Sequence, residues 1–305
     1  MREATAAANC SWPPRTGRTR EDPRNQQQRL TGNREATHVN RMASSQSPGE
    51  TGVHGIGRAS QEVLSIIVAV LENPNSSAEH REQALSELVP LTKDGSPEMW
   101  ENHFRNMLRC LVKELEDQEV PVKVAALRAL AELLKRQPQK FHSYSELTLL
   151  KIFTALKQPE REVSRAAELC ALEAAAALPP EETVRHLHAV TGESDVQGVV
   201  VAAIRVISRL TEVHPKAVTV QLLPQTMPLL KKAYDHNASA VRKAAVFCMV
   251  TLHGVVGTEL MNPHVASLTR SKMALLNLYI KRAQRNSSES ATGSSSTAAS
   301  TNIKL

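Results

Sequence analysis

Val122-Lys123-Val124-Ala125-Ala126 is the first of four copies of a Val-x-x-Ala-Ala stretch, and the later copies begin at Val163, Val199 and Val241. Successive copies start 41, 36 and 42 residues apart, and each continues with apolar residues seven, eight and eleven positions after its valine. These spacings place the apolar side chains on one face of an α-helix. Because such a helical stripe recurs about every 40 residues, the sequence predicts an all-α fold, a HEAT-repeat α-solenoid.

Each copy follows another segment with helical apolar spacing. The sequence therefore predicts five helix pairs and a closing helix at about residues 269–284, and the pairs must stack because one pair cannot bury its own apolar face. Two of the predicted stripes, in the first helix and in the helix before the second copy, consist of Val63, Ile66, Ile67, Val70 and Leu71, and of Leu147, Leu150, Phe153 and Leu156.

The segment from Val218 to Tyr234 is apolar on one side but contains Pro224 and Pro228. Proline inside a helix costs about 3 kcal/mol because it removes a hydrogen bond and clashes with the preceding turn. We therefore expect this helix to be kinked or to start late.

Composition divides the chain into three parts. Residues 1–59 contain nine Arg, no Lys and five acidic residues without apolar periodicity, which predicts a disordered, Arg-rich arm. Residues 60–285 form the predicted solenoid, and residues 286–305 a disordered tail rich in Ser and Thr. Beyond the arm, 28 basic and 26 acidic residues nearly balance. A solenoid that reads nucleic acid is expected to carry a basic stripe, so we predict no specific nucleic-acid partner.

The sequence nominates no catalytic, cofactor-binding or metal-binding residues. His186 and His188 are two positions apart, so on a helix they point about 200° apart and favour a solvated face over a metal site. The cysteines lack zinc or redox spacing and are predicted to be free thiols, three of them buried. The sequence has no apolar run of membrane-spanning length and no secretory signal, which favours a cytoplasmic protein without membrane insertion. The cysteines are Cys10, Cys110, Cys170 and Cys248.

The turns inside the helix pairs are the remaining candidate site, because a solenoid aligns equivalent turns along one edge. They lie at roughly 73–77, 116–121, 157–162, 191–198 and 235–240. Two interpretations remain open: a solvated rim with helix-capping acids, or a protein-binding edge. The acids are Glu116, Asp117, Glu119, Glu160, Glu162, Glu193, Asp195 and Asp235, and the predicted partner-binding bases are Lys123, Lys157, Arg161, Arg165, Arg242 and Lys243.

Five segments resemble one family. VRKAAVFC at 241–248, SKMALLNLYIKRAQ at 271–284, GSPEMWENHF at 95–104, QPQKF at 137–141 and YSELT at 144–148 are similar to the C-terminal domain of the CLASP proteins, the cytoplasmic-linker-associated microtubule regulators. The resemblance covers about residues 60–285 and implies a TOG-like HEAT array.

The resemblance also implies a function. It predicts a non-enzymatic adaptor at microtubule plus ends, the spindle and the kinetochore, with cytoplasmic linker proteins, cortical anchors and a kinetochore kinesin as partners. In tubulin-binding TOG domains the first turn carries a Trp, and here Ala78 holds that place, whereas Trp100 is predicted to be core. A direct tubulin-binding module and a HEAT scaffold subunit of an unrelated complex are the alternatives.

Overall fold

The computed structural model describes residues 54–194 and 196–293, which form helices and no strand. The helices alternate between two layers, because the two helices of a pair pack against each other and most helices also pack against the equivalent helix of the next pair. Layer A contains α1 (His54–Glu72), α3 (Pro97–Glu114), α5 (Ser145–Leu156), α7 (Pro180–Glu193), α9 (Lys216–Tyr234) and α11 (Thr258–Val265). Layer B contains α2 (Ala78–Asp94), α4 (Val120–Arg136), α6 (Arg161–Ala177), α8 (Gln197–Val213), α10 (Ser239–Val256) and α12 (Arg270–Gly293).

The four Val-x-x-Ala-Ala copies are the first turns of α4, α6, α8 and α10, so they form the middle of layer B. The valine and the second alanine of every copy are completely buried. The apolar residues seven, eight and eleven positions further on are buried as well. Small side chains let neighbouring helices of this layer approach closely, which confirms the predicted α-solenoid.

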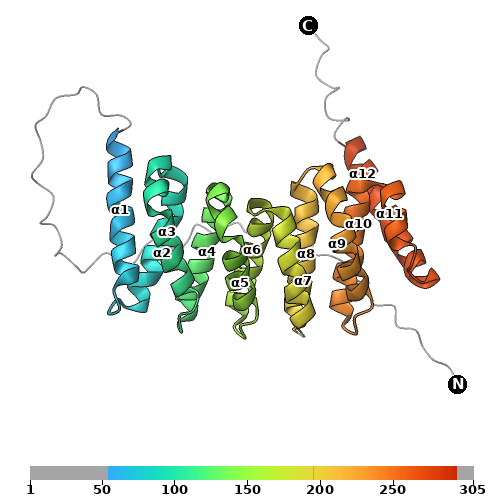
Figure 1. Cartoon of the computed structure of the whole chain (residues 1–305), viewed down its shortest axis with the longest axis horizontal. Helices are drawn as coiled ribbons and strands as arrows, with labels where there is room; N and C mark the ends of the chain where they lie inside the picture. Colours follow the sequence, from blue (N-terminus) through green and yellow to red (C-terminus); the bar gives the residue numbers. More distant parts are fainter. Residues whose placement is uncertain (1–53, 195, 294–305) are drawn as a thin grey trace, which may run out of the picture. The chain divides into compact units, whose positions relative to one another are not determined.

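Five helix pairs stand in a row, and the turns within the pairs lie along one edge of it, the lower edge in Figure 1. Two elements were not predicted. The 3-10 helix η1 (Pro138–Tyr144) occupies the connection between α4 and α5. The short helix α11 follows Gly257, whose φ of 88° lets the chain leave α10 in a conformation that favours glycine.

Two predicted stripes were partly wrong. In α1 the buried residues include Leu64, whereas Val63 and Ile66 are exposed. In α5 Leu147 and Leu150 are exposed, and the buried face includes Thr148, Leu149 and Ile152 beside the correctly predicted Phe153 and Leu156. Both helices belong to layer A, which has helices of layer B on one side only, so apolar residues on its other side stay accessible.

The structure also settles how α9 and α10 are built. Helix α9 runs without a break from Lys216 to Tyr234 and contains Pro224 and Pro228. The expectation that the prolines delay the start of this helix is therefore wrong. The expectation that no apolar run reaches membrane-spanning length was wrong, because helix α10 is long and apolar enough to cross a membrane, with a mean hydropathy of 1.3 over 18 residues. It packs against α8, α9 and α12, and its place in the core accounts for this composition.

The described helices begin at His54 and end at Gly293, whereas the predicted solenoid covered residues 60–285. The predictions for residues 1–53 and 294–305, including Cys10, lie outside the described residues.

Candidate protein-binding edge

The candidate site is the edge formed by the turns that join α1 to α2, α3 to α4, α5 to α6, α7 to α8 and α9 to α10, here called the turn edge. The first turn holds its shape through the Asn73 side chain, whose Oδ1 accepts a hydrogen bond from the backbone N–H of Asn75 at 3.0 Å. Ser77 then caps α2 by accepting a hydrogen bond from the backbone amide of His80. Ala78 follows and is half-buried against the core, so no aromatic side chain stands at this place.

An ion-pair cluster joins α2 to the second turn. The Arg81 Nη1 atom lies 2.7 Å from an oxygen of Glu114 and also donates to Asp117. The side chain of Glu114 is completely buried, and those of Arg81 and Asp117 are mostly buried. Removing a carboxylate from water is unfavourable unless a cation and hydrogen bonds compensate, so Arg81 holds this part of the edge together.

Asp117 is kept ionised by its neighbours. Partial burial opposes ionisation, but hydrogen bonds from Arg81 and from the backbone amides of Glu119 and Gln118 outweigh it and lower the pKa of Asp117. The Glu119 amide donates to Asp117 Oδ1 at 2.8 Å. The aspartate is therefore a structural anion of the second turn.

Two further acids of the edge form ion pairs with lysines of helices beyond their own helix pair. Lys151 of α5 pairs with Glu116, and Lys272 of α12 pairs with Asp235. Glu116 therefore connects the second helix pair to the third, and Asp235 connects the fifth pair to the closing helix α12. The side chains of Glu193 and Asp195 lie outside the described residues.

The six predicted partner-binding bases differ in their surroundings. Lys123 is only 6% exposed, so the edge hardly displays it. Arg242 donates from Nη1 to the backbone carbonyls of His236 and Asn237 at 2.8 and 2.5 Å, which anchors its own turn. The remaining bases are exposed and form the cationic part of the edge, and these are Lys157, Arg161, Arg165 and Lys243.

Sequence reasoning missed Arg81 as a site residue. Its partners Glu114 and Asp117 lie 33 and 36 residues further on, and no local spacing indicates such a contact. It also missed Phe247, which is exposed on α10 although it lies in the segment that resembles the CLASP proteins. Trp100, predicted to be core, is completely buried.

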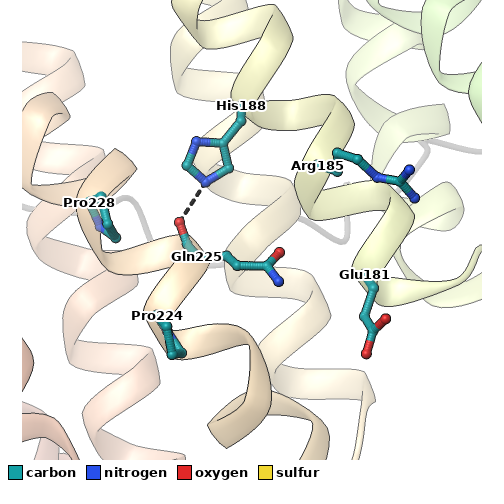
Figure 2. Close-up of a pocket in the computed structure, with 6 residues that line it drawn as sticks. All are labelled: Glu181, Arg185, His188, Pro224, Gln225 and Pro228. Atoms are coloured by element: carbon teal, nitrogen blue, oxygen red, sulfur yellow. Dashed lines mark hydrogen bonds between the residues drawn. The ribbon is translucent and has the colours of Figure 1, made fainter.

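The two histidines of α7 have different neighbours. His188 Nε2 donates to the Gln225 carbonyl of α9 at 2.5 Å, three residues before Pro228, as Figure 2 shows. The His186 ring lies 6.2 Å from the ring of Phe153 in α5. No group of three or more His, Cys, Asp or Glu side chains within residues 60–286 is arranged to hold a metal ion.

Cys110, Cys170 and Cys248 are buried free thiols, as predicted. Burial raises the pKa of Cys170 far above its ordinary value and that of Cys248 to about 12. A thiol acts as a nucleophile only as the thiolate, so these cysteines are packing residues.

No protein-family model matches the chain. CLIP-associating protein 1-A of Xenopus laevis is 39% identical to it over 233 residues, which are 76% of this chain and 16% of that protein. The CLIP-associating protein of Drosophila melanogaster is 32% identical over 223 residues, which are 72% of this chain and 15% of that protein. The chain thus matches about a sixth of the length of these curated relatives.

Solved structures with the same fold include TOG domains. A chain from a study of microtubule plus-end tracking by XMAP215, CLIP-170 and EB1 aligns with a TM-score of 0.60 and 18% identity, over 72% of this chain and 89% of that one. A chain from a TOG domain array of crescerin, which regulates microtubules in the primary cilium, aligns with a TM-score of 0.53 and 16% identity, over 73% and 91%. At these identities the likeness shows the fold, a TOG-like helical array.

Proposed function

The described domain is homologous to part of the CLIP-associating proteins (CLASPs), and we propose that the chain is a non-enzymatic, microtubule-associated adaptor of this kind. The observation that carries the proposal is the 39% identity to CLIP-associating protein 1-A over 233 residues. In this proposal the chain binds plus-end, cortical or kinetochore proteins, cytoplasmic linker proteins among them, and acts in the cytoplasm at microtubule plus ends, the spindle and the kinetochore.

The construction of the turn edge supports binding of another protein. The buried ion pair of Arg81 and Glu114 links the first two helix pairs, and a preorganised edge loses less conformational entropy when a partner binds. Its exposed bases Lys157, at the end of α5, and Arg161 and Arg165, at the start of α6, offer positive charge to an acidic partner surface.

Direct binding of tubulin is the second candidate, and the same exposed bases favour it, because tubulin is acidic. The half-buried Ala78 in the first turn argues for the adaptor, since an aromatic anchor is a typical centre of binding energy in an interface.

Size-exclusion chromatography separates the two candidates. The chain is run with soluble tubulin and, in parallel, with a fragment of a cytoplasmic linker protein, at low and physiological salt. We expect co-elution with the linker fragment. Co-elution with tubulin alone would favour the second candidate, and binding to neither would contradict both.

A charge-reversal variant assigns the interaction to the turn edge. The variant Lys157→Glu/Arg161→Glu/Arg165→Glu is expected to weaken co-elution. Its matched control reverses three exposed bases at the opposite edge, Lys135, Arg136 and Lys216. Equal loss in both variants would show that net charge, and not the turn edge, determines binding.

A further inference from the structure

An exposed apolar surface lies at the C-terminal end of layer B and adjoins the turn edge at Lys243. Leu275, Leu278, Tyr279 and Arg282 of α12 have helical spacing and share one face. The Tyr279 ring meets Phe247 of α10 edge-on, with ring centroids 5.2 Å apart. Phe247 and Leu275 are each 42% exposed and Leu278 is 44% exposed. We call Lys243, Phe247, Leu275, Leu278, Tyr279 and Arg282 the α10–α12 patch.

The surroundings of this patch are strongly basic. Helix α10 and the part of α12 up to Asn286 contain no Asp or Glu. Residues 60–234 contain 20 bases and 23 acids, whereas residues 235–286 contain seven bases and two acids. One of these two acids, Asp235, is already paired with Lys272. The seven bases are Arg242, Lys243, Arg270, Lys272, Lys281, Arg282 and Arg285.

The geometry of the rings disfavours nucleic acid as the occupant. The Lys243 ammonium lies over the Phe247 ring at 5.9 Å from its centroid, and the Arg282 guanidinium lies over Tyr279 at 5.7 Å. A cation thus lies over each ring and the two rings meet in a T-shaped contact, whereas nucleobases bind by stacking on open aromatic faces. The exposed apolar side chains of the patch include two leucines, Leu275 and Leu278, which offer no ring for stacking.

Charge also disfavours a second copy of the chain. A symmetric pairing through α12 would bring Lys243 and Arg282 of one copy close to the same bases of the other, and like charges across an interface are unfavourable. An occupant with carboxylates beside aliphatic side chains complements both features of the patch.

We propose that the α10–α12 patch binds an acidic amphipathic helix of a partner protein. Aliphatic side chains of that helix pack against Phe247, Leu275 and Leu278, and its carboxylates pair with Lys243 and Arg282. Leu275 and Arg282 are seven residues apart, or about 10 Å along α12, which matches two turns of a bound helix. The inference rests on the proposed adaptor function and specifies the chemistry of one partner.

A selection experiment tests the proposal with defined probes. A displayed library of 16-residue peptides, varied among Glu, Gln, Lys, Leu, Ile and Ala, is selected on the full chain. Enriched peptides are then synthesised with a fluorescent label, and their Kd values are measured by anisotropy. We expect enriched peptides to be acidic, with Leu or Ile recurring three or four residues apart.

Variants assign the binding to the patch. Leu278→Glu and Arg282→Glu are each expected to weaken binding at least tenfold. The control Leu169→Glu changes a leucine that is 60% exposed on α6 and is expected to leave Kd unchanged. If circular dichroism shows that Leu278→Glu is misfolded, the double variant Lys243→Glu/Arg282→Glu carries the test.

Three outcomes would overturn the proposal: enrichment of basic or uncharged peptides, no enrichment, or equal binding by the patch variants. Flotation with phosphatidylserine vesicles, lost in Leu278→Glu, would assign the patch to a lipid surface if no acidic peptide binds. Linker-fragment co-elution that persists in such a case would leave the proposed function standing and refute only the patch assignment.

Discussion

At the residue scale, the cluster around Arg81 decides how the second turn is held. Arg81 compensates a carboxylate, that of Glu114, which has no exposed surface. Arg81→Ala leaves this carboxylate without its closest cation, since the next, Lys113, lies 3.7 Å from it and is largely exposed. We expect the free energy of unfolding to fall by about 3 kcal/mol, the usual cost of breaking a buried ion pair by removing one partner. Urea titration of both proteins measures the difference.

The matched control for Arg81→Ala is Arg109→Ala. Arg109 pairs with Glu72 across a similar separation in the sequence, 37 residues, but the two side chains are 70% and 45% exposed. An exposed pair contributes little, so Arg109→Ala is expected to cost about 0.5 kcal/mol. Similar costs for the two variants would mean that burial of Glu114 does not matter.

The pH dependence of stability gives a second prediction about this cluster. The pKa of Asp117 is lowered in the folded chain, so its contribution is complete above the ordinary value of about 3.9 and is lost as pH falls through the lowered folded pKa. We expect Asp117→Asn to lose less stability than the unchanged chain when pH falls from 5 to 3. The free energies of unfolding of both proteins, measured at intervals across this range, give the difference curve. A flat difference curve would contradict the role of Asp117.

At the scale of a helix, the paired alanines determine how closely layer B packs. Ala167 of α6 is completely buried, and Ala176 lies exposed on the same helix. Because the interior has no room for three more carbon atoms, Ala167→Leu is expected to lower the free energy of unfolding by about 2 kcal/mol. The control Ala176→Leu should change it by less than about 0.5 kcal/mol. Thermal or urea unfolding distinguishes them, and tolerance of leucine at Ala167 would show that the close approach is unnecessary.

How much the sequence predicts also depends on the element. The buried faces of α4, α6, α8 and α10 in layer B were predicted correctly. These helices have neighbours on several sides, so the apolar residues with helical spacing are also the buried ones. In α5 the apolar Leu147 and Leu150 suggested a face that the structure exposes, while Thr148 is buried. Helix α11 escaped prediction because it has only eight residues and contains Pro263.

The turn edge was predictable in position but not in detail. The positions of the turns follow from the repeat, and so do the exposed bases Lys157, Arg161 and Arg165. The burial of Lys123 and the bonds of Arg242 to its own turn depend on side-chain geometry that residue type and spacing do not specify. The same holds for Arg81, whose partners come from another helix pair.

At the scale of the whole domain, stability should be a sum over neighbouring helices, because each helix packs mainly against its partner and the adjacent pairs. Helix α12 closes layer B and buries Leu276 against the core, together with parts of Met273, Tyr279 and Ile280. A chain that ends at Leu268 loses this cover over α10.

We expect the chain that ends at Leu268 to have a lower Tm by roughly 10 °C, since uncovering one leucine and several half-buried side chains costs at least about 3 kcal/mol. The helices before α12 should remain folded, so helical circular dichroism at low temperature should fall only by the share of α12. A chain that ends at Gly293 is the control and should keep its Tm. Loss of all helical signal in the shorter chain would show that the array folds as one indivisible unit, because a sum over neighbours leaves distant pairs such as α3 and α4 unaffected.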